Sequence, residues 1–221
     1  MMKIINILIA LILILTPKIS YAEKDTLFWV APVIQKNLND NIGTWLEFQS
    51  RFKNDSSQVD RIMIRPGINY NVGNGITLWL GYAYAPFTIG TSSKFYDEHR
   101  IWQQGLHTLK IDEGVQLLSR LRFEQRFIEN KDNIIHRVRY QERFVYRPKS
   151  WNNFGVAIWD EIFFNINTKD MFDQNRSAFG VQYVINKNIV LEPTYMLLIQ
   201  SRENKDNLYG NTGLLFIWIT L

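Results

Sequence analysis

The sequence predicts an all-β fold, namely a single antiparallel up-and-down transmembrane β-barrel of about 10–12 strands after a cleaved signal peptide. Three observations lead to this prediction. The N-terminus has the features of an export signal, the rest of the chain divides into long β-type segments, and most of these segments have one apolar and one charged side.

The export signal consists of Lys3, an unbroken apolar run over 7–15, and the small residues Ser20 and Ala22. This pattern is typical of a secretory signal peptide that is cut after Ala22. The apolar run is shorter than the roughly 20 residues that a spanning helix needs, and polar side chains interrupt every later run. We therefore expect a signal peptide over 1–22, one outer-membrane β-barrel domain over 23–221, and no helical span.

Eleven segments rich in aromatic and β-branched residues are separated by clusters of Asn, Asp, Gly, Lys and Ser. Strands of soluble sandwiches are typically about 5–6 residues long, whereas tilted strands that cross a bilayer need about 9–11. The length of the segments therefore favours a membrane barrel. The expected strands cover residues 26–36, 42–53, 59–71, 76–86, 97–111, 115–128, 134–147, 154–166, 174–185, 189–201 and 207–221.

Alternation along these segments assigns their two faces, because successive side chains of a strand point to opposite sides. In the segment 115–128, Leu121 and Phe123 fall on one side, while Arg122 and Glu124 fall on the other. Arg and Glu suit an enclosed interior in which charges pair, whereas a solvated face would be rich in lysine. The charged face is therefore expected to line the lumen.

Aromatic residues divide into two groups. One group lies near strand ends, where an interfacial girdle would place it: Trp29, Tyr70, Tyr82, Tyr84, Tyr146, Trp151 and Tyr209. The other falls on the charged face and is expected to fill the lumen: Trp45, Trp79, Trp102, Trp159 and Trp218.

Short and long connections alternate along the chain. The short ones cover 37–41, 72–75, 112–114, 148–153 and 186–187, and the long ones cover 54–58, 87–96, 129–133, 167–173 and 201–207. The pair Asn74-Gly75 is the clearest hairpin signal. Short turns are expected to be periplasmic and long loops extracellular.

The number of segments conflicts with the even strand number of bacterial single-chain barrels. Either residues 26–36 lie outside the wall, which leaves ten strands, or a further crossing makes twelve. Pro32 lacks a ladder donor and fits an edge or irregular strand. This favours ten strands plus an atypical N-terminal segment.

Several runs with distinctive residues span nearly all of the chain after the signal peptide: 65–70, 80–82, 98–104, 120–127, 137–140, 160–164 and 172–176. Together they resemble the bacterial domain-of-unknown-function family catalogued as 2490. The resemblance implies an outer-membrane-like barrel and implies no activity or site residues. One departure is the C-terminus, because the alternating Leu215, Ile217 and Ile219 end in Leu221 rather than in an aromatic residue.

The charged face supplies sixteen candidate lumen-lining residues: Glu47, Arg51, Arg61, Arg65, Glu98, Arg100, Arg120, Arg122, Glu124, Arg126, Arg137, Arg139, Arg143, Glu161, Arg176 and Glu192. Two interpretations remain open. Paired Arg and Glu side chains would fill and occlude the lumen of a small barrel. The surplus of Arg over Glu would instead line a narrow, porin-like path for small anionic solutes, or a pocket for an anionic or lipidic ligand.

The composition excludes several other functions. The absence of cysteine rules out thiolate catalysis, cysteine-ligated metals and disulfides. Lys3 and Lys18 supply part of the formal charge of +4, so the remaining bias is too small to indicate nucleic-acid binding. His99, His107 and His136 do not have the spacing of metal ligands, so no metal or cofactor is expected.

A membrane hydrolase, for example one that modifies lipid, would need a histidine near a serine and an acid. His99 beside Glu98, and Ser119 further along, are the only suggestions of this, and no spacing motif joins them. A polar histidine near a strand end is the simpler interpretation. We therefore assign no catalytic residue and expect that the protein is not an enzyme.

Two acidic residues do not fit the apolar face. Glu142 and Asp160 fall there, and a charge near the bilayer midplane would be costly. A bulge, a position near the headgroups or a protein partner would each resolve this conflict. The expected location is the outer membrane, with membrane lipid and the barrel-assembly machinery as partners.

Overall fold

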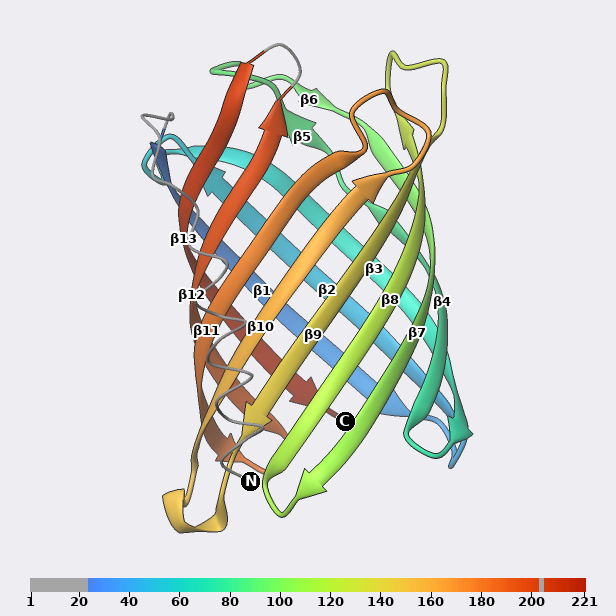
Figure 1. The fold of residues 1–221 in the computed structure, drawn as a ribbon, viewed down its shortest axis with the longest axis vertical. Coiled ribbons are helices and arrows are strands. Elements are labelled where there is room, and N and C mark those ends of the chain that lie inside the picture. The colour runs from blue at the N-terminus through green and yellow to red at the C-terminus, as the bar shows by residue number, and fades with distance from the viewer. Residues whose placement is uncertain (1–23, 203–204) are drawn as a thin grey trace, which may run out of the picture.

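The computed structural model describes residues 24–202 and 205–221, which form a β-barrel (Figure 1). The predicted signal peptide lies outside the described residues. Within them, the helical structure is the short 3-10 helix η1, Lys149–Trp151. No helix in this part of the chain is both long enough and apolar enough to cross a membrane.

The strands follow the predicted segments closely. They are β1 Lys24–Asn37, β2 Ile42–Lys53, β3 Gln58–Gly73, β4 Ile76–Tyr84, β5 Phe87–Thr88, β6 Phe95–Tyr96, β7 Glu98–Asp112, β8 Val115–Ile128, β9 Ile135–Tyr146, β10 Phe154–Asn165, β11 Phe172–Asn186, β12 Ile189–Arg202 and β13 Lys205–Thr220. The two-residue strands β5 and β6 form a small hairpin inside the long connection from β4 to β7. The other eleven strands build the closed wall.

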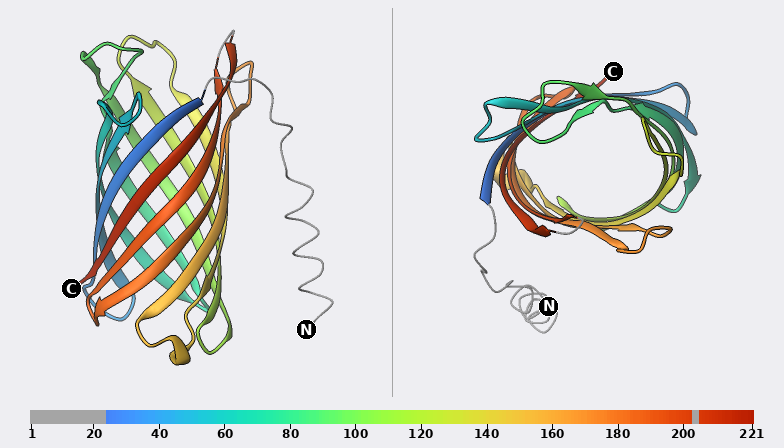
Figure 2. Two further views of the ribbon diagram at one scale, coloured as in Figure 1. Left: turned by 90° about the vertical axis from the view of Figure 1, so that its left-hand side faces the viewer. Right: turned by 90° about the horizontal axis from the view of Figure 1, so that it is seen from above.

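The barrel closes between its first and last strands, and this pair is parallel (Figure 2). The other neighbouring strands of the wall pair antiparallel. The predicted all-β barrel is confirmed, and its eleven strands lie within the expected range. The preference for ten strands was wrong, because it assumed antiparallel closure, whereas a parallel closing pair requires an odd number.

The segment that had been set apart, residues 26–36, therefore lies in β1 and belongs to the wall. Its proline does interrupt a ladder, as expected from its missing N–H. The pairing of β1 with β2 omits Ala31 and Pro32, while on the other side Pro32 lies beside Ile217 of β13. The proline thus weakens one edge of the strand without removing the strand from the barrel.

The predicted short turns lie at one end of the barrel and the described long connections at the other (Figure 1). The turn between β3 and β4 has positive φ at Asn74 and Gly75, as a tight Asn-Gly hairpin requires. A Cβ on Gly75 would lie 2.3 Å from the carbonyl oxygen of Thr108, so this position has no room for a side chain. β1 begins at the long-loop end and β13 ends at the short-turn end (Figure 2).

Burial in the wall is the reverse of that in a water-soluble protein. On β8, Leu121 is 56% exposed, whereas Arg122 is 3% exposed and Glu124 is fully buried. Outward positions on other strands are also large and apolar, including Phe48, Ile64 and Phe179. The charged side chains therefore face the lumen and the apolar ones face the surroundings.

The lumen also contains all five tryptophans that were predicted to fill it, because each of them lines a cavity inside the barrel. Trp102 and Trp159 are almost fully buried. The ring of Trp102 packs directly on two paired glycines, Gly67 and Gly81. A Cβ at either position would lie within 3 Å of the ring, so the ring has room only because both residues lack a side chain. Trp29 was expected in the outer girdle, and this was wrong: it is 4% exposed and packs inward with Leu27 and Ala31.

Candidate lumenal site

All sixteen sequence-predicted residues lie on the inward side of the wall. Their strands position them at alternate residues, and β8 and β9 each contribute three arginines to the same enclosed space. What the sequence did not predict is which side chains meet, because contacts across a lumen depend on how the strands are staggered around the barrel.

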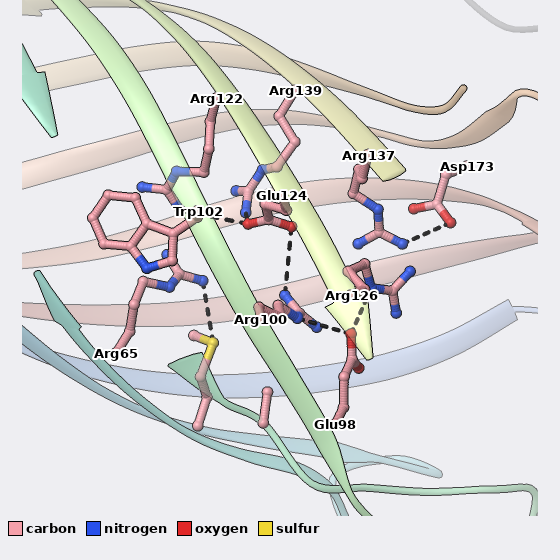
Figure 3. A network of polar contacts seen from close by, with 12 residues as sticks. Arg65, Glu98, Arg100, Trp102, Arg122, Glu124, Arg126, Arg137, Arg139 and Asp173 are labelled. Carbon is pink, nitrogen blue, oxygen red and sulfur yellow. Dashed lines mark hydrogen bonds and ion pairs between the residues drawn. The ribbon is translucent and has the colours of Figure 1, made fainter. Parts of the chain in front are cut away.

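Glu98 is the centre of one group of contacts. It is fully buried, and its carboxylate accepts hydrogen bonds from Arg61 at 2.6 Å, from Arg100 at 2.8 Å and from Arg126. These arginines come from β3, β7 and β8, so one carboxylate links three strands of the wall. Figure 3 shows Arg100 and Arg126 at this carboxylate.

Arg139 connects a second group. Its guanidinium lies 2.8 Å from Glu124 and 2.7 Å from Glu161, which stand on the strands to either side of it. Arg120 reaches the same Glu161 at 2.6 Å. Arg100 lies 3.7 Å from Glu124 and thereby joins this group to the contacts around Glu98 (Figure 3).

Three further ion pairs complete the network. Arg65 contacts Glu47 at 3.1 Å, and Arg137 contacts Asp173 at 2.9 Å. Arg143 on β9 contacts Glu192 on β12 at 2.6 Å. Two strands separate β9 from β12 in the wall, so this last pair bridges strands that are not neighbours and spans part of the lumen.

Three lumenal arginines are held differently. Arg122 donates two hydrogen bonds to the side-chain oxygen of Gln104, stacks on Trp102 at 4.7 Å, and lies only at the limit of an ion pair with Glu124, 3.8 Å away. Within the described part of the chain, Arg51 and Arg176 form no ion pair with a carboxylate. Both guanidinium groups lie instead over the ring of Trp29, at 4.0 and 4.9 Å from its centroid.

Two cavities remain between these side chains. The larger has a volume of about 870 Å³ and extends to the long connections, including Ile89, Lys131 and Lys169. The smaller, about 310 Å³, lies toward the short-turn end. In this half the ring of Trp45 contacts those of Trp79 and Trp218, with centroid distances of 5.5 and 6.0 Å.

The four residues Trp29, Arg51, Arg139 and Arg176 line both cavities. They therefore mark the level at which the upper cavity ends and the lower one begins. We call the larger cavity the vestibule and these four residues its floor.

The residues suspected of hydrolase chemistry are not arranged as expected. His99 contacts Tyr82 and lies beside Phe127, away from Ser119. Ser119 faces outward opposite His107 and donates its hydroxyl hydrogen bond to Glu142 at 2.9 Å. The serine thus bonds the acid directly, and no serine–histidine hydrogen bond is formed among these residues. In the described ranges, 24–202 and 205–221, no group of three His, Cys, Asp or Glu residues could hold a metal ion.

The fold and this interior define a class of protein: a closed β-barrel whose lumen contains a buried arginine–carboxylate network and two cavities between its side chains. The chain belongs to the family described as "Protein of unknown function (DUF2490)", with a family model that matches residues 26–209. This confirms the family resemblance noted in the sequence.

A relative with similar length is an uncharacterized protein of Methylorubrum extorquens, which is 29% identical over 198 residues, covering 86% of each chain. No solved structure was found to match the chain.

Proposed function

We propose that the protein is an outer-membrane β-barrel whose lumen is closed at rest by its arginine–carboxylate network, and that it is not an enzyme. The observation that carries the proposal is the reversal of burial across the wall. Leu121 faces outward and is 56% exposed, while Glu124, three residues further along β8, is fully buried. Such an exterior is costly in water and favourable in hydrocarbon.

The dimensions support the same conclusion. Most wall strands contain twelve or more residues, for example β8 with 14 and β9 with 12. About 9–11 residues are enough for a tilted strand to cross a bilayer. Closure of the sheet removes its edges, and this is the condition for placing strands in lipid.

Closure of the lumen is supported by the ion pair Arg143–Glu192, which bridges strands that are not neighbours, and by the contacts of Trp45 with Trp79 and Trp218 in the lower half. A buried ion pair that loses one partner leaves an uncompensated charge, so the network resists piecemeal opening. Small anionic solutes are the ones that the surplus of arginine would admit if the network opened.

The location is tested by fractionation and gel mobility. The wild-type protein is expected in the outer-membrane fraction, and the folded barrel is expected to resist SDS until it is heated. A water-soluble periplasmic monomer would overturn the proposed location. Closure is tested separately, by recording conductance of the refolded barrel in planar bilayers. We expect no steady current, and a constant anion-selective current at low voltage would show an open pore.

Single-cysteine labelling tests the orientation, and the natural absence of cysteine makes the background clean. Thr91→Cys lies in a long connection and Lys187→Cys in a short turn, and both positions are exposed. We expect a membrane-impermeant maleimide to label Thr91→Cys on intact cells and to label Lys187→Cys only after the outer membrane is permeabilised. The reverse pattern would place the short turns outside.

A further inference from the structure

The floor of the vestibule contains positive charge without a matching carboxylate. Arg51 donates to Gln49 at 2.6 Å and Arg176 donates to Gln174 at 3.2 Å, so both use neutral acceptors. Arg176 is 7% exposed, and its Nε is buried without a hydrogen-bond partner. The other predicted lumenal arginines each lie within ion-pair distance of a carboxylate, so these two are the exception.

The two guanidinium groups are close to each other. Both lie over the same ring, that of Trp29, so their central carbons are no more than about 9 Å apart. They come from β2 and β11, on opposite sides of the closing seam formed by β1, β12 and β13. Like charges at this distance in a partly dehydrated space repel each other, and an anion between them would remove that repulsion.

The vestibule gives an anion a route to this position. Its volume of about 870 Å³ lies in the range of small-molecule sites, and it reaches the long connections. Lysines near its mouth, such as Lys131 and Lys169, add positive charge along the way. Among the described residues, five carboxylates, including Glu129 and Asp170 near these lysines, also line the vestibule, but ten basic side chains outnumber them. A cavity with a net positive charge raises the local concentration of anions.

One side of the vestibule floor is apolar. Leu27, Trp29, Phe163 and Leu198 line the cavity next to the two arginines. Leu27 and Trp29 of β1 and Leu198 of β12 belong to one packed cluster, and Arg176 also lies over Phe163 at 4.5 Å. An anion with a small apolar body would therefore find an apolar surface within reach of the charged groups.

We propose that Arg51 and Arg176 form a binding site at the floor of the vestibule for the carboxylate or phosphate group of a small amphiphilic solute. The apolar part of the solute packs on Leu27 and Leu198, and its oxyanion accepts hydrogen bonds from both arginines, including the unpartnered Nε of Arg176. The forked geometry of guanidinium favours oxyanions in general. This inference rests on the barrel of the proposed function but not on its location or on closure of the lumen.

The test uses the full refolded barrel in a non-ionic detergent and phosphate-free buffer, with calorimetric titration of phenyl phosphate, hexanoate, inorganic phosphate and neutral phenol. We expect both amphiphilic anions to bind, inorganic phosphate to bind about tenfold more weakly for lack of apolar contact, and phenol to show no saturable binding. Absence of binding by both amphiphilic anions would overturn the site. Equal binding of inorganic and phenyl phosphate would overturn the apolar part of the proposal.

Variants assign the binding to the two arginines. Arg51→Gln and Arg176→Gln are each expected to weaken binding by about tenfold or more, because each removes a charged donor from the same oxyanion. Lys169→Gln removes the same charge from the mouth of the vestibule and serves as the matched control, with an expected change of less than about threefold. Equal losses in all three variants would indicate general attraction by charge and would refute a local site.

Heat-modifiable gel mobility checks that each variant is folded before titration. Arg51→Lys is a second test if Arg51→Gln does not fold, since it keeps the charge and loses the fork. Because conductance and fractionation are measured independently, failure of binding leaves the proposed location and closure standing, and failure of those leaves the binding result interpretable.

Discussion

Carboxylates occur on both faces of the same barrel wall, and the two faces hold them differently. Inside, Glu98, Glu124 and Glu161 are each contacted by at least two arginines. Outside, Glu142 and Asp160 stand directly opposite each other on β9 and β10. Among the described residues, neither of these two outward carboxylates has a cation beside it.

The outward pair is held by neutral donors. Ser119 and the hydroxyl of Tyr140 donate to Glu142, while Ser177 and Asn175 donate to Asp160 at 2.6 and 3.0 Å. The sequence presented these two acids as a conflict, and neither a bulge nor a nearby base resolves it: the β9–β10 register is regular there. The comparison suggests that the interior is stabilised by charge neutralisation, whereas the exterior tolerates two carboxylates only because hydroxyl and amide groups surround them.

The largest expected effect comes from removing an inner carboxylate. Glu98→Ala leaves Arg61, Arg100 and Arg126 converging on an empty position, and it should destabilise the barrel by about 3–5 kcal/mol. Urea unfolding of the refolded protein in lipid, followed by tryptophan fluorescence, measures this. Glu98→Gln keeps one acceptor oxygen and should lower the stability of the barrel by less than the alanine variant does. A loss below 1 kcal/mol for the alanine variant would contradict a central role for Glu98.

The next effect concerns the outward face. Phe123 points outward on β8 and stacks on His136, and Phe123→Arg would place a charge in the bilayer at a cost of about 2–4 kcal/mol if the site lies near the midplane. We expect this variant to lose heat-modifiable folding. If it folds as a water-soluble monomer, the membrane assignment fails.

A smaller effect of opposite sign is expected at the outward acids. Glu142→Gln keeps the hydrogen bonds of Ser119 and Tyr140 within reach and removes one of two like charges that face each other across the strands. It should stabilise the barrel by about 0.2–1 kcal/mol, in the same urea assay. Asp160→Asn is the matched variant on the neighbouring strand. Destabilisation by both would mean that the two charges are needed, for example to hold a basic partner.

The smallest effect is expected at Arg122, the inward neighbour of Phe123. Its hydrogen bonds go to Gln104 rather than to a carboxylate, so Arg122→Gln should cost no more than about 1 kcal/mol and leave gel mobility unchanged. The variant is the control for Phe123→Arg, because it changes the adjacent residue on the other face. A loss of stability as large as that caused by Phe123→Arg would contradict the assignment of Arg122 to a charged inner face and Phe123 to an apolar outer face.

Much of this arrangement was predictable from local pattern. Alternation alone placed Arg122 and Glu124 on one face and Phe123 on the other, and the strand bounds follow the aromatic and β-branched segments. Trp29 was misplaced because its position near a strand end was given more weight than its alternation with Leu27, Ala31 and Val33, which are all buried. The period-2 pattern of β1 would have placed it correctly.

Features that depend on distant segments were not predictable in this way. No residue of β1 indicates that it will pair in parallel with β13, because the choice depends on how the whole sheet closes. The same holds for the Arg143–Glu192 contact and for the position of Arg51 and Arg176 around one ring. These follow from the stagger of strands around the barrel, which a single sequence does not reveal.

The parallel closing pair has a consequence for rearranging the chain. In an even-stranded barrel both wall ends lie at one rim, so a short linker can join them and new termini can be opened in any loop. Here β1 begins at one rim and β13 ends at the other. A circular permutant would therefore need a linker that runs the height of the wall, about 3.3 Å for each residue of strand that it passes. The two ends of the wall instead suit a pair of different reporters, one at each rim of the barrel.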